Sequence, residues 1–174
     1  MQQIKIPVSL DPVRAANKRL DYQGVIPGGQ MKRLNGASAG DCSEVTVSLT
    51  CGVDIQGIVY LKGKAVTELT LECQRCMTPF NTEVMVDFCF TPVKDGAEID
   101  ELPDMYDPIE VNDYGEVHLH QLIEDELIVA MPIIATHQEG ECNTGSQDLT
   151  VGKIEEVQEE RPNPFAVLEK LKSK

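Results

Sequence analysis

Aromatic residues are scarce in this sequence, which contains no tryptophan and only four phenylalanines and four tyrosines among 174 residues. Hydrophobic residues nevertheless make up 41% of the chain, an ordinary share for a globular protein. A chain of this length can bury one substantial core but has little room for two full domains. We therefore expect a single domain over residues 1–174 with a modest core.

No apolar run approaches the roughly 20 residues that a membrane-spanning helix needs. The first residues, Met1 to Pro7, also lack the charged start, long apolar stretch and small-residue cleavage site of a secretion signal. Both absences predict a cytoplasmic protein that has no membrane partner. In that compartment we expect the six cysteines to be thiols or metal ligands rather than disulfides.

Motifs of common enzyme classes are missing as well: there is no triad-like spacing of serine, histidine and aspartate, and no glycine-rich phosphate loop. The acids Glu124 to Glu126 diverge by about 100° per residue around a helix, so they cannot converge on one Mg²⁺ and are interpreted as a solvated face. His118 and His120 are two residues apart, do not converge either, and are interpreted as element-boundary residues. We therefore expect no catalysis and no small-molecule substrate.

Basic residues are almost absent from one long stretch of the chain. Residues 95–160 hold 19 acidic groups and a single base, Lys153, and the formal net charge of the whole protein is −14. Residues 1–34, in contrast, carry six basic and two acidic groups, and the tail 161–174 carries four and one. Because the average field repels phosphate, any contact with nucleic acid has to be local.

The apolar pattern predicts strands and one early helix in the first half of the chain. Residues 2–10 alternate weakly and are interpreted as a first strand. Asp11-Pro12 is then a strong helix start that predicts a helix over 11–21. Residues 24–40 are rich in glycine and are interpreted as a loop. Alternation then predicts strands at 45–51, at 54–61 and 64–72 as a hairpin that turns at Lys62-Gly63, and at 84–90.

The second half of the chain is more polar. Residues 95–107 are expected to form a flexible acidic connector and residues 138–160 a flexible acidic segment. Leu119, Leu122, Ile123 and Leu127 follow helical spacing, which predicts an amphipathic helix near 119–131, and a short C-terminal helix starts at Asn163-Pro164. The expected fold is α+β, with a mainly antiparallel sheet that could close into a small barrel, an N-terminal helix and these two later helices.

The pair Cys73-Gln-Arg-Cys76 can direct two sulfurs toward one centre, which suits a metal, a disulfide or a redox role. No thioredoxin-like βαβ pattern surrounds it, and Cys42, Cys51 and Cys89 lie in or beside strand runs, where they are interpreted as small hydrophobes. One hypothesis adds His137 and Cys142 to the pair, which completes the Cys3His set that is typical of a structural zinc. The alternative is a set of ordinary thiols and a surface imidazole.

Five segments in the same order along the chain resemble the bacterial YceD family, the large ribosomal RNA subunit accumulation proteins of gammaproteobacteria. They are Leu10 to Gly24, Leu71 to Cys76, Pro108 to Val111, Glu124 to Glu126 and Asn163 to Leu168. The resemblance implies a cytoplasmic, non-catalytic factor needed for synthesis, processing or stability of large-subunit ribosomal RNA. Its implied partners are the precursor RNA or ribosome assembly proteins. Other branches of the family carry a second cysteine pair late in the chain, in the region where this sequence has His137 and Cys142.

A cationic group near the start of the chain is the candidate for contact with RNA. Its members are Lys5, Arg14, Lys18, Arg19, Lys32 and Arg33. Only one aromatic residue, Tyr22, is close by in sequence, so recognition of RNA shape is favoured over reading of bases. Two alternatives stay open: the group is a solvated face or is bound by carboxylates, or the protein is an interaction adaptor that works through its acidic segment without touching RNA.

Overall fold

The computed structural model describes residues 4–93, 102–138 and 140–142, with only the backbone of residues 4 and 5. The chain divides into two units, Met1–Asn143 and Thr144–Lys174, and the description concerns the first. The C-terminal helix expected from Asn163, most of the acidic segment 138–160 and most of the connector 95–107 lie outside the described residues. The prediction of one domain over residues 1–174 stays a prediction.

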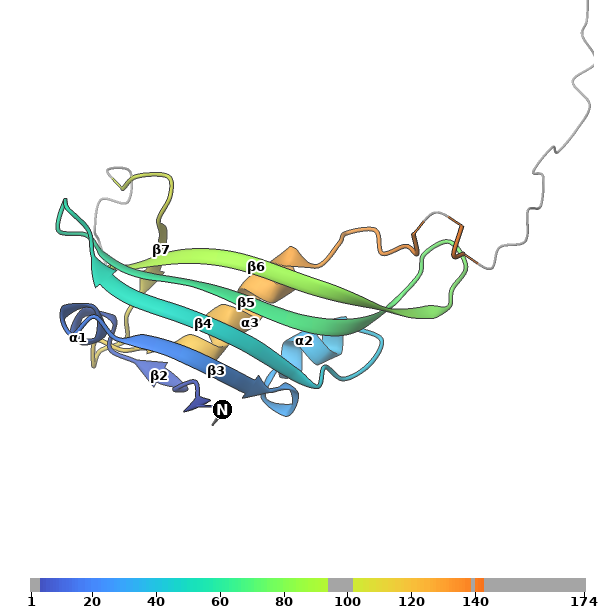
Figure 1. The fold of residues 1–174 in the computed structure, drawn as a ribbon, viewed down its shortest axis with the longest axis horizontal. Coiled ribbons are helices and arrows are strands. Elements are labelled where there is room, and N and C mark those ends of the chain that lie inside the picture. Colours follow the sequence, from blue (N-terminus) through green and yellow to red (C-terminus); the bar gives the residue numbers. More distant parts are fainter. Residues whose placement is uncertain (1–3, 94–101, 139, 143–174) are drawn as a thin grey trace, which may run out of the picture. The chain divides into compact units, whose positions relative to one another are not determined.

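A six-stranded sheet organises the described residues, and its strand order is β1-β3-β4-β5-β6-β7 (Figure 1). Neighbouring strands from β3 to β6 are antiparallel, whereas β1 pairs with β3 and β7 pairs with β6 in parallel. The strands of the sheet are β1 (Ile4–Lys5), β3 (Asp21–Pro27), β4 (Glu44–Val53), β5 (Val59–Glu72), β6 (Pro79–Val93) and β7 (Asp107–Glu110). A second, two-stranded sheet joins β2 (Ser9–Leu10) to β8 (Val117–His118).

The predicted fold class is wrong in three respects. The sheet is mixed rather than mainly antiparallel, and it is open, with β1 and β7 as its edges, so it does not form a barrel. The described residues begin with the strands expected within 2–10, and the N-terminal helix expected over 11–21 is reduced to α1 (Pro12–Asn17), which has six residues instead of eleven. Parallel edge pairing depends on residues far apart in the sequence, which local alternation cannot reveal.

Two further predictions fail in the first half of the chain. The expected loop 24–40 contains most of β3 and helix α2 (Lys32–Ala37), joined by a short 3-10 turn at Gly28–Gln30. The hairpin between β4 and β5 turns at residues 54–58, and Gly63 lies within β5. A Cβ atom on Gly63 would stand 2.5 Å from the Ser48 carbonyl oxygen and 2.6 Å from the Phe88 ring, so the glycine provides space for packing and not for a turn.

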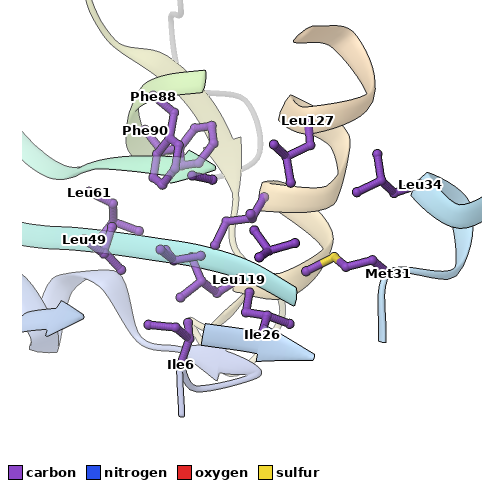
Figure 2. Close-up of a cluster of buried hydrophobic side chains, with 14 of the residues drawn as sticks. Ile6, Ile26, Met31, Leu34, Leu49, Leu61, Phe88, Phe90, Leu119 and Leu127 are labelled. Carbon is purple, nitrogen blue, oxygen red and sulfur yellow. The ribbon is translucent and has the colours of Figure 1, made fainter. Parts of the chain in front are cut away.

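Helix α3 (Leu119–Ala130) covers one face of the sheet and builds the core with it (Figure 2). Leu119, Ile123 and Leu127 repeat every four residues along one side of the helix and are fully buried. They meet alternate residues of the strands, such as Leu49 and Phe90. Each such side chain contributes about 1.5–3 kcal/mol by burial. The predicted helix near 119–131 is therefore present, and it is what places the segment after residue 130.

The opposite face of the sheet carries the other set of alternating side chains, which no described helix covers. On β4 and β5 these are the even-numbered residues, and most of them, for example Thr46, Thr50 and Lys62, are exposed. In the described part of the chain, no helix is long and apolar enough to cross a membrane. The sheet thus offers one packed face and one face that is open to solvent.

Candidate metal centre and cationic surface

The turn between β5 and β6 holds the cysteine pair. The Cys73 N–H donates to the Thr78 carbonyl at 3.0 Å, and the Met77 N–H donates to the Cys73 carbonyl at 2.8 Å. Met77 adopts a φ of +59°, the left-handed conformation that a tight turn requires. These local bonds fold residues 73–78 into a small loop, and both cysteine sulfurs belong to one cluster of side chains.

The segment that follows α3 is bound to this loop. The Gln74 N–H donates to the Ala135 carbonyl at 2.9 Å, and the Arg75 guanidinium donates to the His137 carbonyl at 2.8 Å. The Phe80 ring lies against the imidazole of His137, with ring centroids 4.7 Å apart. These contacts carry His137 and the residues that follow it to the cysteine pair, more than 60 residues away in sequence.

Four potential ligands meet at this point, and we refer to Cys73, Cys76, His137 and Cys142 as the Cys3His cluster. Their sulfur and nitrogen atoms all lie within 4.8 Å of one another. The Cys73 and Cys142 sulfurs are 3.5 Å apart, and His137 Nδ1 is 3.4 Å from the Cys76 sulfur and 3.7 Å from that of Cys142. A tetrahedral zinc with ordinary bond lengths separates two sulfurs by about 3.8 Å and sulfur from nitrogen by about 3.6 Å. The cluster could therefore hold a metal ion.

The pKa values of the cluster differ from one group to the next. Burial alone would raise the pKa of the Cys73 thiol, but backbone N–H groups of His137 and of the turn donate to its sulfur and bring the pKa to about 5. A hydrogen bond with the Thr78 hydroxyl lowers the pKa of Cys76, and contact with Cys73 raises that of His137. Burial raises the pKa of Cys142 to about 11. The Cys73 sulfur is thus set up as a thiolate, the form that binds metal.

The structure places the six cationic candidates differently. Arg14, Lys18 and Arg19 lie on α1 or directly after it and are exposed, and we call them the α1 surface. Lys32 is exposed at the start of α2, and only the backbone of Lys5 is described. Within the described residues, ion pairs involve Arg33 alone. No described carboxylate therefore neutralises the α1 surface.

Arg33 is bound by carboxylates of α3. Its guanidinium contacts Glu124 at 3.2 Å and also pairs with Asp125. Glu124 also accepts the N–H groups of Arg33 at 2.7 Å and of Leu34 at 3.2 Å, so it caps the start of α2. The interpretation of Glu124 as part of a solvated face is wrong, because the residue is buried between the two helices. Within the described residues, Arg33 is therefore the one cationic candidate that carboxylates bind, as one of the alternatives to RNA contact expected.

The sequence interpretation missed two features of this part of the molecule. Lys62 was assigned to a turn, although it lies in β5 and, like Lys64, belongs to the open face of the sheet. Their even numbering within an alternating strand was the available signal. A groove of about 460 Å³ next to the Cys3His cluster, lined by Leu71, Met131 and Ala135 among others, had no signal, because its walls come from three separate segments.

Comparisons with known proteins point to one family. A family model described as "Large ribosomal RNA subunit accumulation protein YceD" matches residues 61–172. A curated protein from Haemophilus influenzae, named "Large ribosomal RNA subunit accumulation protein YceD", is 39% identical over 174 residues, which covers all of both chains. No solved structure matches.

Proposed function

The chain belongs to the YceD family of large ribosomal RNA subunit accumulation proteins, and we propose that it is a non-catalytic accessory factor in the biogenesis of the large ribosomal subunit. It acts in the cytoplasm and supports the synthesis, processing or stability of the large-subunit ribosomal RNA. It does so by binding the precursor RNA, and the α1 surface is the main contact. One observation carries the proposal: the cations of the α1 surface are exposed and form no ion pair with a described carboxylate, although the chain as a whole is strongly acidic.

The electrostatic argument concerns where phosphate can approach. The protein as a whole has a net charge of −14 and repels a polyanion. Arg14, Lys18 and Arg19 stand close together in sequence, and no described carboxylate forms an ion pair with them. A phosphate backbone is attracted to such a local surface and pushed away from the acidic remainder, which also orients the RNA.

A pair of charge-matched variants tests this proposal. Arg14→Gln with Lys18→Gln removes two charges from the α1 surface, and Ile133→Glu with Ile134→Glu changes the net charge by the same amount beside the Cys3His cluster. The first variant should weaken binding to a labelled precursor RNA about tenfold and reduce the salt dependence of binding by about 1.5 in log–log slope. The second should bind like the unmodified protein. Equal effects of both variants, or no RNA crosslinked to the unmodified protein in cells, would refute direct binding through α1.

We also propose that the Cys3His cluster holds one structural zinc ion. Three thiolates and an imidazole suit this borderline-soft ion, and the spacing of their atoms supports a tetrahedral site. Four protein ligands leave no open position for water or substrate, which supports a structural role over a catalytic one. The ion would fasten the segment after α3 to the turn between β5 and β6.

Metal analysis of protein purified without chelator tests the zinc site. We expect about one zinc per chain. Cys73→Ser with Cys76→Ser should remove the metal, whereas Cys89→Ser, which alters a half-buried thiol outside the cluster, should leave it in place. Metal-free protein in which the thiols of the cluster react freely would exclude the site.

A second candidate function is a protein-interaction adaptor that acts through its acidic residues without contact to RNA. The groove of about 460 Å³ beside the cluster favours a protein partner, because Ile133 and Ile134 at its side are 94% and 67% exposed. Under this hypothesis the Ile133→Glu and Ile134→Glu variant loses its partner, and so does a variant with neutralised acidic residues. Loss of charge at the α1 surface then has no effect.

A further inference from the structure

A polar pocket opens at the end of the sheet that carries α1. Its volume is about 250 Å³, below the roughly 300–1,000 Å³ that drug-sized ligands occupy, so it suits a single flat ring system. It lies where Leu20, just after α1, accepts a hydrogen bond from the Cys51 N–H at 3.0 Å. The pocket is lined by Arg19, Asp21, Thr50, Cys51, Gly52, Val53 and Tyr60.

Tyr60 forms an aromatic wall of this pocket. It pairs with Gly52 across β4 and β5, and a Cβ atom on Gly52 would stand 2.6 Å from the tyrosine ring. The glycine therefore lets the ring lie close over the β4 backbone, which holds the aromatic plane in place. Tyr60 is half-buried and belongs to the open face of the sheet. A base can stack on such a ring.

Arg19 stands at the rim in a strained conformation. Its φ is +51°, and it occupies the position after α1 where glycine is the relaxed choice. The bonds from Arg19 N–H to the Ala16 carbonyl at 3.0 Å and from Leu20 N–H to the Ala15 carbonyl at 3.1 Å define this helix end. A charged side chain at a position that favours glycine suggests a role for its guanidinium, because Arg19 is one of the residues that line the pocket.

The cross-strand register adds charge and hydrogen-bonding groups around the ring. Asp21, Thr50 and Lys62 form one row across β3, β4 and β5, adjacent to the row of Gly52 and Tyr60. Lys62 is exposed and lies directly opposite Thr50 on the open face. The pocket thus combines an aromatic ring, the cationic Arg19, a hydroxyl and one carboxylate that can accept from the N–H groups of a base, and Lys62 adds a cation in the row beside it.

We propose that this pocket binds one unstacked nucleobase of single-stranded RNA. Tyr60 stacks on the base, Arg19 and Lys62 contact the neighbouring phosphates, and Asp21 and Thr50 face the edge of the base. The proposal rests on the proposed function, since it names the part of the RNA that the protein recognises beyond phosphate. A base within a duplex is already stacked and cannot enter, so the RNA is single-stranded, bulged or terminal at this point.

Fluorescence anisotropy with a labelled 12-nucleotide unstructured RNA tests the pocket, and a duplex of the same length serves as the reference ligand. Tyr60→Ala should weaken binding of the single strand about tenfold, and Tyr60→Phe should restore it. Tyr114→Ala is the matched control, because Tyr114 is 88% exposed in a turn outside the pocket, and it should have no effect.

Arg19→Gly separates binding from folding. Glycine relaxes the left-handed position, so the melting temperature should rise by about 1–3 °C while the affinity for the single strand falls several-fold. A residue with only a structural role would not produce these opposite changes. Crosslinking of a 4-thiouridine RNA to the unmodified protein supplies a measurement without mutation, and the attached peptide should contain Tyr60.

The outcomes distinguish the two proposals. If Tyr60→Ala binds like Tyr114→Ala, or if the duplex binds as tightly as the single strand, the pocket is refuted. The proposed function survives that result when Arg14→Gln with Lys18→Gln still weakens binding. If the unmodified protein binds neither RNA, both proposals are refuted.

Discussion

The two turns at opposite ends of β5 are built in different ways. The backbone of the turn between β4 and β5 is closed by its own residues: the Asp54 carboxylate accepts the N–H groups of Gln56 and Ile58, both at 2.8 Å. Among the described residues, the one distant group bonded to this carboxylate is the Tyr106 hydroxyl. The turn between β5 and β6 contains Cys73 and Cys76, and its remaining partners, His137 and Cys142, come from beyond α3. With about 3.3 Å per residue, the 14 residues of β5 keep the two turns more than about 40 Å apart.

The two short helices show the same contrast. Asp11 caps α1 from three residues away, accepting the Arg14 N–H at 2.9 Å. The cap of α2 is Glu124, about 90 residues further along the chain. Caps supplied by neighbouring residues need no distant partner, whereas caps supplied by distant residues depend on the completed fold. Removal of a single distant partner should therefore lower stability more than removal of a neighbouring one.

If the Cys3His cluster holds the proposed zinc ion, its removal should have the largest effect on local stability, and only at one end of β5. Chelation should then accelerate amide exchange of Gln74 and Met77 at least about 100-fold, because metal binding energy would support the local structure there. The amide of Ile58, bonded to Asp54, should change little. Hydrogen exchange measured by mass spectrometry or NMR resolves the two turns. Equal acceleration at both ends would show that the turns are not independent.

Loss of the distant cap should cost more than loss of the local one. Glu124→Ala leaves one buried and one partly buried N–H group of α2 without this acceptor and should lower the free energy of unfolding by about 2–3 kcal/mol. Asp11→Ala removes one exposed cap of α1 and should cost about 1 kcal/mol. Urea denaturation of both variants provides the comparison. A larger loss for Asp11→Ala would contradict the ranking.

The smallest effect on stability should follow from removing the Tyr106 hydroxyl, which donates a hydrogen bond to Asp54. Although desolvation opposes it, hydrogen bonds from Ile58 N–H and the Tyr106 hydroxyl keep the pKa of Asp54 below its usual value. A depressed folded-state pKa adds stability above the unfolded pKa, and this is lost as the pH falls through the folded value. Tyr106→Phe should raise the pKa of Asp54 in a carbon-13 NMR titration and make stability less sensitive to acid. Tyr114→Phe should change neither.

Sequence patterns predicted the elements whose pattern is local. Alternation located β4, and four-residue spacing located α3, because burial of one face imposes those periods. The start of α1 was predicted by Asp11-Pro12, but its end was not, since Arg19 occupies a position where glycine is the usual signal. Gly63 was interpreted as a turn residue because the ring of Phe88, which needs its missing side chain, is distant in sequence.

The candidate site was predicted in part for the same reason. Ligand type and the spacing of Cys73 and Cys76 singled out the pair, and residue type alone added His137 and Cys142, all four of which the structure brings together. Whether zinc binds there stays a prediction. Tyr60 was not identified, because two other residues of its pocket, Arg19 and Asp21, belong to another part of the chain.

By itself the sequence determined which residues carry charge, which faces are apolar and which side chains can bind a soft metal, because these depend on residue type and short-range spacing. Only the tertiary structure decided that the sheet is open and mixed, that Glu124 pairs with Arg33, and that Arg19 and Tyr60 line one pocket. These outcomes depend on contacts between segments far apart along the chain. The free energy of such contacts comes from packing and desolvation in three dimensions, which no local pattern records.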